Sequence, residues 1–395
     1  MPSDDPANPY LADAATALIE SLRDRILDIR AGDFPTDTPL ALAETFRRLT
    51  DAIGATLATT TDGRTLQLCL VLLKRLGSHL RYLEAASAER VPWGLIRPIE
   101  RMLTQVAPGS SAMVRARWSY NYSILELYDH YRYALRSLLP PVTLQKVFGD
   151  PKQKFFVVSI PLIERDNILL HLVLGHEIGH RIAEAYLDLE DKHSVLTSVT
   201  TRIGDAKWYQ PDIEKMPPLL ALQIRQRLMD EILRVRRRGL EEIISDLTGF
   251  YLFGPAFLFA LIEFAYDDVL DEVPTPEDYY PPWRFRYRQC LKAFDDTNWS
   301  ELERCLGNEL PAPRVRDAYR DWIEYLRKTA SNDADEKAIA SQRLTKRAYE
   351  EIGSALPTIH PFIVGRLGPL AYSIDKAKND FPHLLERLAK GVPPN

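Results

Sequence analysis

The 395-residue sequence lacks the marks of a secreted, membrane-embedded or nucleic-acid-binding chain. Its first residues, MPSDDPANPYLADAA, hold neither a basic nor an apolar segment, so we expect no signal peptide. The most apolar stretch, 247–264, is interrupted by polar residues, glycine and proline, and we expect no membrane span. With 50 Lys and Arg against 55 Asp and Glu, the net charge of −5 gives no general attraction to nucleic acid.

Cysteine is scarce as well. The chain has three, Cys69, Cys290 and Cys305, an odd number without C-x-x-C spacing. This argues against a disulfide framework and for a reducing compartment, so we expect a cytoplasmic protein. The apolar content of 46% and the charged content of 27% are ordinary for a globular protein.

The strongest functional signal lies in the stretch 166–185. It contains His176-Glu177-Ile178-Gly179-His180, an H-E-x-x-H pattern, in a chain with only 8 histidines. Apolar residues recur around it at helical spacing and no proline intervenes, which predicts one buried or half-buried helix. Residues four apart share a helix face, so both histidines could bind one zinc ion, with Glu177 beside them as a proton acceptor for water.

A simpler interpretation is that both histidines cap or pack a core helix. Burying two histidines and a glutamate without a partner charge is unfavourable, and we therefore favour the metal site. Zinc in a catalytic site usually has three protein ligands, so a third must come from elsewhere in the chain.

The best candidate for the third ligand is Glu242, in the segment 239–249. Asp246 lies four residues later on the same predicted helix face, where it could accept a hydrogen bond from a ligating histidine. Glu241 is the alternative in register, but its partner at that spacing is Ser245, a weaker acceptor. An ordinary amphipathic helix with acidic residues on its wet face remains the alternative for this segment.

H-E-x-x-H followed by E-x-x-x-D on a later helix resembles the gluzincin metallopeptidases, most closely those of the HtpX and CAAX prenyl protease kind. The resemblance covers 166–185 and, with gaps, 238–286. It implies a zincin-like core that hydrolyses peptide bonds within protein or peptide substrates, as an endopeptidase does. It also implies a Zn²⁺ cofactor on His176, His180 and Glu242, with Glu177 as general base and Asp246 behind a histidine.

The family also carries His-Pro followed by an arginine six residues after the histidine. Tyr280–Arg286 has this spacing with tyrosine in place of histidine, and His360–Arg366 has both the residue and the spacing. Either Tyr280 or His360 could donate a hydrogen bond to the oxyanion of a tetrahedral intermediate, and Arg286 or Arg366 of the same segment could assist it. Proximity to Glu242 in sequence slightly favours Tyr280.

The remaining pattern predicts a mainly α-helical protein with a small β-sheet. Residues 1–140 should form an N-terminal helical domain, with helices at 9–30, 36–58, 65–86 and 91–106. Pro140-Pro141 marks the expected boundary, and 141–395 should form the zincin-like domain with C-terminal helices. The segment 154–160 reads as a strand, and the resemblance implies an edge strand that aligns substrate.

Two further segments suggest functions of their own. Residues 115–138 interleave aromatics with arginines, which can stack nucleic-acid bases, although a helix with a packed aromatic face is favoured. Residues 188–218 could form a lid over the cleft. A run of arginines, 234–238, is expected at a helix end.

Three functions are therefore carried forward. The leading one is a zinc metallopeptidase. The second is a catalytically inactive zincin scaffold, a regulatory module that binds a protein partner through the N-terminal helices. The least favoured is a nucleic-acid binder that uses 115–138, and no membrane partner is expected.

Overall fold

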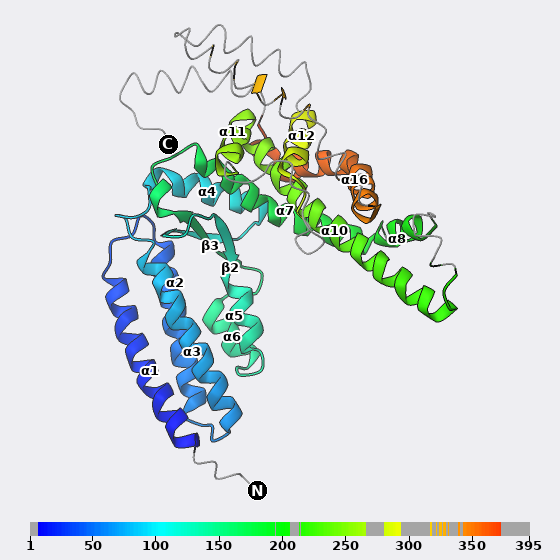
Figure 1. Cartoon of the computed structure of the whole chain (residues 1–395). Helices are drawn as coiled ribbons and strands as arrows, with labels where there is room; N and C mark the ends of the chain where they lie inside the picture. Colours follow the sequence, from blue (N-terminus) through cyan, green and yellow to red (C-terminus); the bar gives the residue numbers. More distant parts are fainter. Residues whose placement is uncertain are drawn as a thin grey trace. The chain divides into compact units, whose positions relative to one another are not determined.

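The computed structural model describes residues 7–193, 195–205, 215–265, 280–293 and 343–372, together with isolated positions elsewhere. The chain forms two compact units that divide between Ile168 and Leu169. The break thus falls later than Pro140-Pro141, because the helix and strand that follow these prolines pack with the first unit. In the described ranges helices predominate beside one three-stranded sheet, as the sequence predicts (Figure 1).

Four helices begin the first unit, close to the predicted bounds: α1 (Ala7–Arg30), α2 (Thr38–Leu57), α3 (Gly63–Glu84) and α4 (Trp93–Val106). Helix α3 starts where Asp62 accepts the Thr65 backbone N–H at 2.8 Å. The first three helices pack on one another around a buried apolar core that includes Ile26, Phe46 and Leu73 (Figure 1). Burial of this helical face is what holds the unit together.

The sheet of the first unit consists of β1 (Ser111–Arg117), β2 (Ser123–Glu126) and β3 (Phe155–Pro161) in the order β1-β3-β2. Strand β3 pairs parallel with β1 and antiparallel with β2, and every residue in it is buried. The strand predicted at 154–160 is confirmed, but its expected place at a sheet edge is wrong. Both of its edges are already hydrogen-bonded, so it cannot bind a substrate by strand addition.

The helix favoured for 115–138 is also wrong. This segment contributes to β1 and β2 and then to a short helix, α5 (Leu127–Leu135), before α6 (Pro141–Phe148) and the 3-10 turn η1 (Leu162–Glu164). Its arginines serve the fold: Arg132 donates to the backbone carbonyls of Asp150, Pro151 and Gln153. Pairing with a distant strand outweighs the local helical pattern here.

The second unit is helical throughout its described residues. Its elements are η2 (Leu170–Val173), α7 (Leu174–Lys192), α8 (Val195–Asp205), α10 (Pro218–Phe253), α11 (Pro255–Phe264), α12 (Trp283–Ala293), α16 (Arg343–Leu367) and η3 (Gly368–Leu370). Helix α10 packs along α7 and also contacts α16 and α12 (Figure 1). The lid proposed for 188–218 falls partly outside the described residues, and its described parts extend α7 and form α8.

The single helix predicted over 166–185 is shorter at its start than expected. A 3-10 turn precedes α7, which begins only at Leu174, and Ile168 is 78% exposed instead of packing on a helix face. The apolar residues from Leu174 onward behave as predicted, since Ile178 and Ile182 are buried. The H-E-x-x-H residues therefore lie in the first two turns of α7.

Helix α10 runs without a break through both the arginine run and the acidic segment, so the expected helix end at 238 is wrong. The arginines are instead neutralised by side-chain pairing. Arg236 donates two hydrogen bonds of 2.8 Å to Glu190 of α7, and both side chains are buried. This bidentate ion pair fixes α7 against α10.

Among the helices of the described ranges, none has the length and apolar content that crossing a membrane requires. Cys69 and Cys290 are free thiols buried in the two units, in line with a packing role. Cys305 lies outside the described residues.

Candidate metal site

The site begins with the close approach of α7 and α10. A Cβ atom on Gly179 would lie 2.4 Å from the Cα of Ser245, and one on Gly175 would lie 2.8 Å from the Cα of Gly249. The two helices therefore touch backbone to backbone along a seam of small residues. This contact sets how far a side chain on α10 must reach to meet one on α7.

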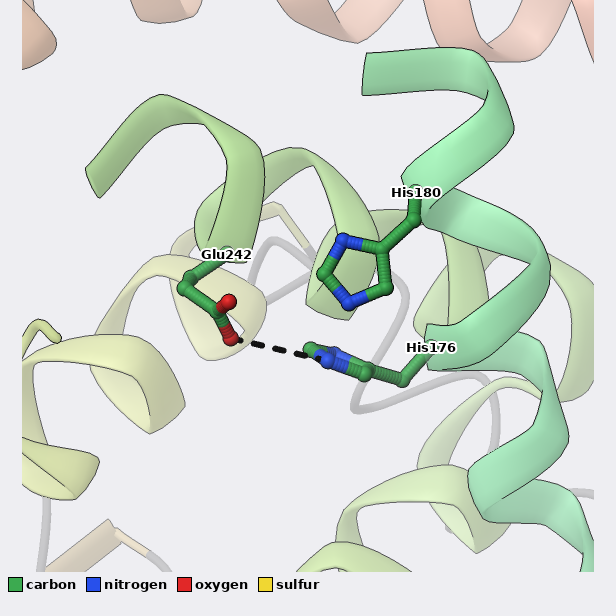
Figure 2. A group of neighbouring side chains, drawn as sticks. All are labelled: His176, His180 and Glu242. Atoms are coloured by element: carbon green, nitrogen blue, oxygen red, sulfur yellow. Dashed lines mark ion pairs between the residues drawn. The ribbon is translucent and has the colours of Figure 1, made fainter. Parts of the chain in front are cut away.

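His176, His180 and Glu242 converge across this seam (Figure 2). The two imidazoles come from one face of α7, with ring centroids 4.7 Å apart, and the glutamate points toward them from α10. Their potential ligand atoms all lie within 4.8 Å of one another, and His176 Nε2 lies 3.5 Å from Glu242 Oε2. Of the two glutamates in register, Glu242 joins the histidines, in agreement with the sequence-based preference.

Asp246 lies behind the first histidine. Its Oδ1 accepts a 2.8 Å hydrogen bond from His176 Nδ1, which leaves Nε2 of the ring directed at Glu242. Arg286 of α12 holds the same carboxylate with two hydrogen bonds, of 2.6 Å from Nε and 2.8 Å from Nη2. Burial by itself raises the pKa of Asp246, but the charge and hydrogen bonds of Arg286 outweigh it and bring that pKa to about 2.

Arg286 occupies a different place from the one suggested by the sequence. Its guanidinium is buried, lies 4.0 Å from the centroid of the Trp283 ring, and also pairs with Glu242 Oε2 at 3.3 Å. It is thus committed to two carboxylates of the site. A role in stabilising an oxyanion directly does not fit a guanidinium so engaged.

Glu242 is almost fully buried and has two arginines near it. Arg238, one turn earlier on α10, places Nη2 3.0 Å from Oε1, but this oxygen still makes no hydrogen bond among the described groups. A buried carboxylate oxygen without a hydrogen bond is costly to leave in that condition. Its position beside two imidazoles makes a cation the natural additional partner.

Glu177 is half-buried in the first turn of α7. Burial raises the pKa of its carboxyl above the ordinary value, against the opposing charges of His176 and His180. A carboxyl with a raised pKa is a stronger base than an exposed one, as general-base catalysis near neutral pH requires.

Tyr280 is close to this group of residues. Its hydroxyl is hydrogen-bonded to Arg238, whose guanidinium lies 4.4 Å from the centre of the tyrosine ring. Because Arg238 also pairs with Glu242, one side chain separates Tyr280 from the ligand set. Tyr280 is 44% exposed.

His360 is placed differently. It lies within α16, and Pro361 is internal to that helix. Its Nδ1 bonds to the hydroxyl of Tyr251 at 2.9 Å, while Arg366 lies over the ring of Phe362. Among the described residues His360 contacts neither the two histidines nor Glu242, whereas Arg238 links Tyr280 to Glu242, so of the two candidates Tyr280 lies nearer the site.

Two features of the site were not identified in the sequence. The sequence pattern predicts a helix end at Arg238, whereas its spacing of four from Glu242 is the spacing of an ion pair within a helix. The second feature is the set of small residues at the helix contact. On α7 these are Gly175 and Gly179, whose spacing of four is a signal of close helix approach, and Gly249 faces them from α10.

No family model, curated protein or solved structure matches the chain. The resemblance to gluzincins therefore rests on the motif residues and on the buried group that they form.

Proposed function

We propose that this chain is a zinc-dependent peptidase that uses water as its nucleophile. The observation that supports this most is the convergence of His176, His180 and Glu242, two imidazoles and a carboxylate, across one helix crossing. This is a donor set of catalytic zinc sites, which bind the metal through three protein ligands and keep one position open.

The three residues are of types that bind zinc, and one pair of their donor atoms is spaced as zinc ligands are. Two ligands bound tetrahedrally at about 2.0–2.1 Å are roughly 3.4 Å apart, and His176 Nε2 and Glu242 Oε2 lie 3.5 Å apart. Glu242 Oε1, which makes no hydrogen bond among the described groups, and the Asp246 hydrogen bond behind His176 also agree with a ligand role.

A zinc ion held by these residues would polarise a carbonyl group and make a water molecule more acidic. Glu177 would take the proton of that water as it attacks the scissile carbonyl, and then deliver it to the leaving amine. The hydroxyl of Tyr280, which Arg238 links to Glu242, would donate a hydrogen bond to the oxygen that becomes negatively charged. Asp246 and Arg286 would keep the first imidazole in one orientation throughout.

The first experiment is the zinc content of purified protein. Wild type should hold about one zinc per chain, and His180→Ala and Glu242→Ala should each lose most of it, because two ligands are too few for a stable site. Wild-type protein without zinc after expression with ample metal would refute the proposal.

The second experiment separates an enzyme from a scaffold. Glu177→Gln should keep zinc and reduce cleavage of a denatured protein substrate by at least about a hundredfold, because a general base contributes that much. Glu184→Gln is the matched control, since Glu184 lies on the same helix but pairs with Arg181 and is exposed. Zinc-loaded wild type that cleaves nothing would instead favour the scaffold.

A further inference from the structure

The arrangement behind His176 has a counterpart behind His180. The Nδ1 atom of His180 is buried and makes no hydrogen bond among the described groups. Glu241 Oε1 lies 3.5 Å from it, slightly beyond the hydrogen-bond range. A buried imidazole nitrogen without a hydrogen bond is unfavourable, and a small rotation of the ring toward Glu241 would relieve this.

Glu241 is itself held in place from the other side. Its second oxygen, Oε2, accepts a 2.8 Å hydrogen bond from Arg238 Nη1. Arg238 is fixed in turn by its hydrogen bond to Tyr280 and by the contact of its guanidinium with the tyrosine ring. The carboxylate thus has one oxygen fixed by an arginine and the other directed at a histidine.

A similar pattern occurs at Asp246, where Oδ2 accepts from Arg286, and Oδ1 accepts from His176 and also from Arg286. The two carboxylates lie on opposite sides of Glu242 along α10, and each faces the Nδ1 atom of a different histidine. The site therefore has an arginine–carboxylate–histidine chain behind each of its imidazoles.

We propose that Glu241 is a positioning residue of the metal site, which accepts the Nδ1–H of His180 and so directs Nε2 of that ring to the metal. Arg238 orients Glu241 for this task. The inference rests on the proposed metal site and adds to it a role for the glutamate that is not a ligand. A neutral imidazole carries one N–H, and fixing it on Nδ1 leaves the lone pair on Nε2.

The expected effect is smaller than at Asp246. Glu241 and Arg238 are about one-third exposed, whereas Asp246 and Arg286 are buried, so water can partly replace the Glu241 carboxylate. Loss of a group that orients a metal ligand commonly weakens metal binding by about 10–100-fold, and Glu241 should lie near the lower limit.

The test is the zinc dissociation constant of the full-length chain, measured by competition with a chromophoric chelator. Glu241→Ala should weaken binding about tenfold, and Glu241→Gln, which keeps a carbonyl acceptor, should recover part of the loss. Glu231→Ala is the matched control, because Glu231 on the same helix accepts a hydrogen bond of 2.7 Å from Arg234 with the same three-residue spacing. It should bind zinc as the wild type does.

The outcomes separate the two proposals. Unchanged zinc affinity in Glu241→Ala, or an equal loss in Glu231→Ala, would overturn the positioning role and leave the metal site intact. Wild-type protein that binds no zinc would overturn the metal site, and the positioning role with it. If Glu241→Ala does not fold, judged by thermal unfolding without metal, Glu241→Gln is compared with wild type instead. Weaker zinc binding by Glu241→Gln would support the positioning role, and unchanged binding would overturn it.

Discussion

Replacing Gly179 by alanine should force α7 and α10 apart. The new Cβ would lie 2.4 Å from Ser245 Cα, whereas ordinary contact begins at 3.4 Å, so the gap to be made is 3.4 − 2.4 = 1.0 Å. The obstacle is backbone, which cannot rotate away as a side chain can. We expect overpacking of about 3 kcal/mol, reduced by about 1 kcal/mol because alanine favours a helix. The net loss in free energy of unfolding is then about 2 kcal/mol.

The same displacement should damage the metal site. Glu242 lies one turn from Ser245 on α10 and moves with it, away from the two histidines of α7. Ligand constellations tolerate displacements of only about 0.5 Å, so zinc binding should weaken by roughly tenfold or more. Urea unfolding without metal measures the first effect, and chelator competition measures the second.

Gly353→Ala is the control for both measurements. Gly353 is an exposed residue inside α16, and a Cβ there would meet nothing within 4 Å. Its replacement should stabilise the protein by about 0.5–1 kcal/mol and leave zinc affinity unchanged. If Gly179→Ala behaves like Gly353→Ala in both assays, the close contact of α7 with α10 does not set the geometry of the site.

Three other perturbations test separate parts of the chain. Arg236→Met should cost about 3–5 kcal/mol in urea unfolding, because it leaves Glu190 buried without its partner, and the double variant with Glu190→Met should recover most of the loss. Burial raises the pKa of Glu126 from 4.5 to about 7. Because this carboxyl ionises more readily in the unfolded chain, it lowers the stability of the folded state as pH rises from 4.5 to about 7, and it has no such effect at lower pH. Glu126→Gln, which keeps the oxygen that accepts the Asp129 N–H, should therefore raise the melting temperature at pH 8 and leave it unchanged at pH 4; an equal effect at both would contradict the burial of the charge. Tyr280→Phe should lower kcat about 10–100-fold with zinc retained, whereas His360→Gln should not, and the opposite pattern would assign the oxyanion donor to His360.

The helices were predictable where their apolar spacing was strong and their ends were marked. Helices α1 to α4 follow the predicted bounds because Gly32, Asp62 and Pro92 stand at or near those ends. The segment that forms β1 was misassigned because its stability comes from pairing with β3, whose residues follow much later in the chain. Local spacing carries no information about such a partner.

The candidate site was more predictable than the sheet, because it lies on two regular helices. A spacing of four placed His176 with His180 on one face, and the same spacing joined Glu242 to Asp246 and favoured it over Glu241. The positions of Arg238 and Arg286 depend on how three helices meet, and a one-dimensional pattern does not determine that. For the same reason the choice between Tyr280 and His360 stayed open in the sequence.

The continuity of α10 has a consequence for how this protein can change during evolution. Between Arg236 and Asp246 the helix carries the arginine that pairs with Glu190 of α7, and also Arg238, which pairs with both Glu241 and the proposed ligand Glu242. All of these residues lie in one unbroken helical register. Each residue added to an α-helix turns everything beyond it by about 100°. A single insertion or deletion there would direct these side chains to different faces at once. Substitution can therefore adjust this segment, but its length must be inherited unchanged.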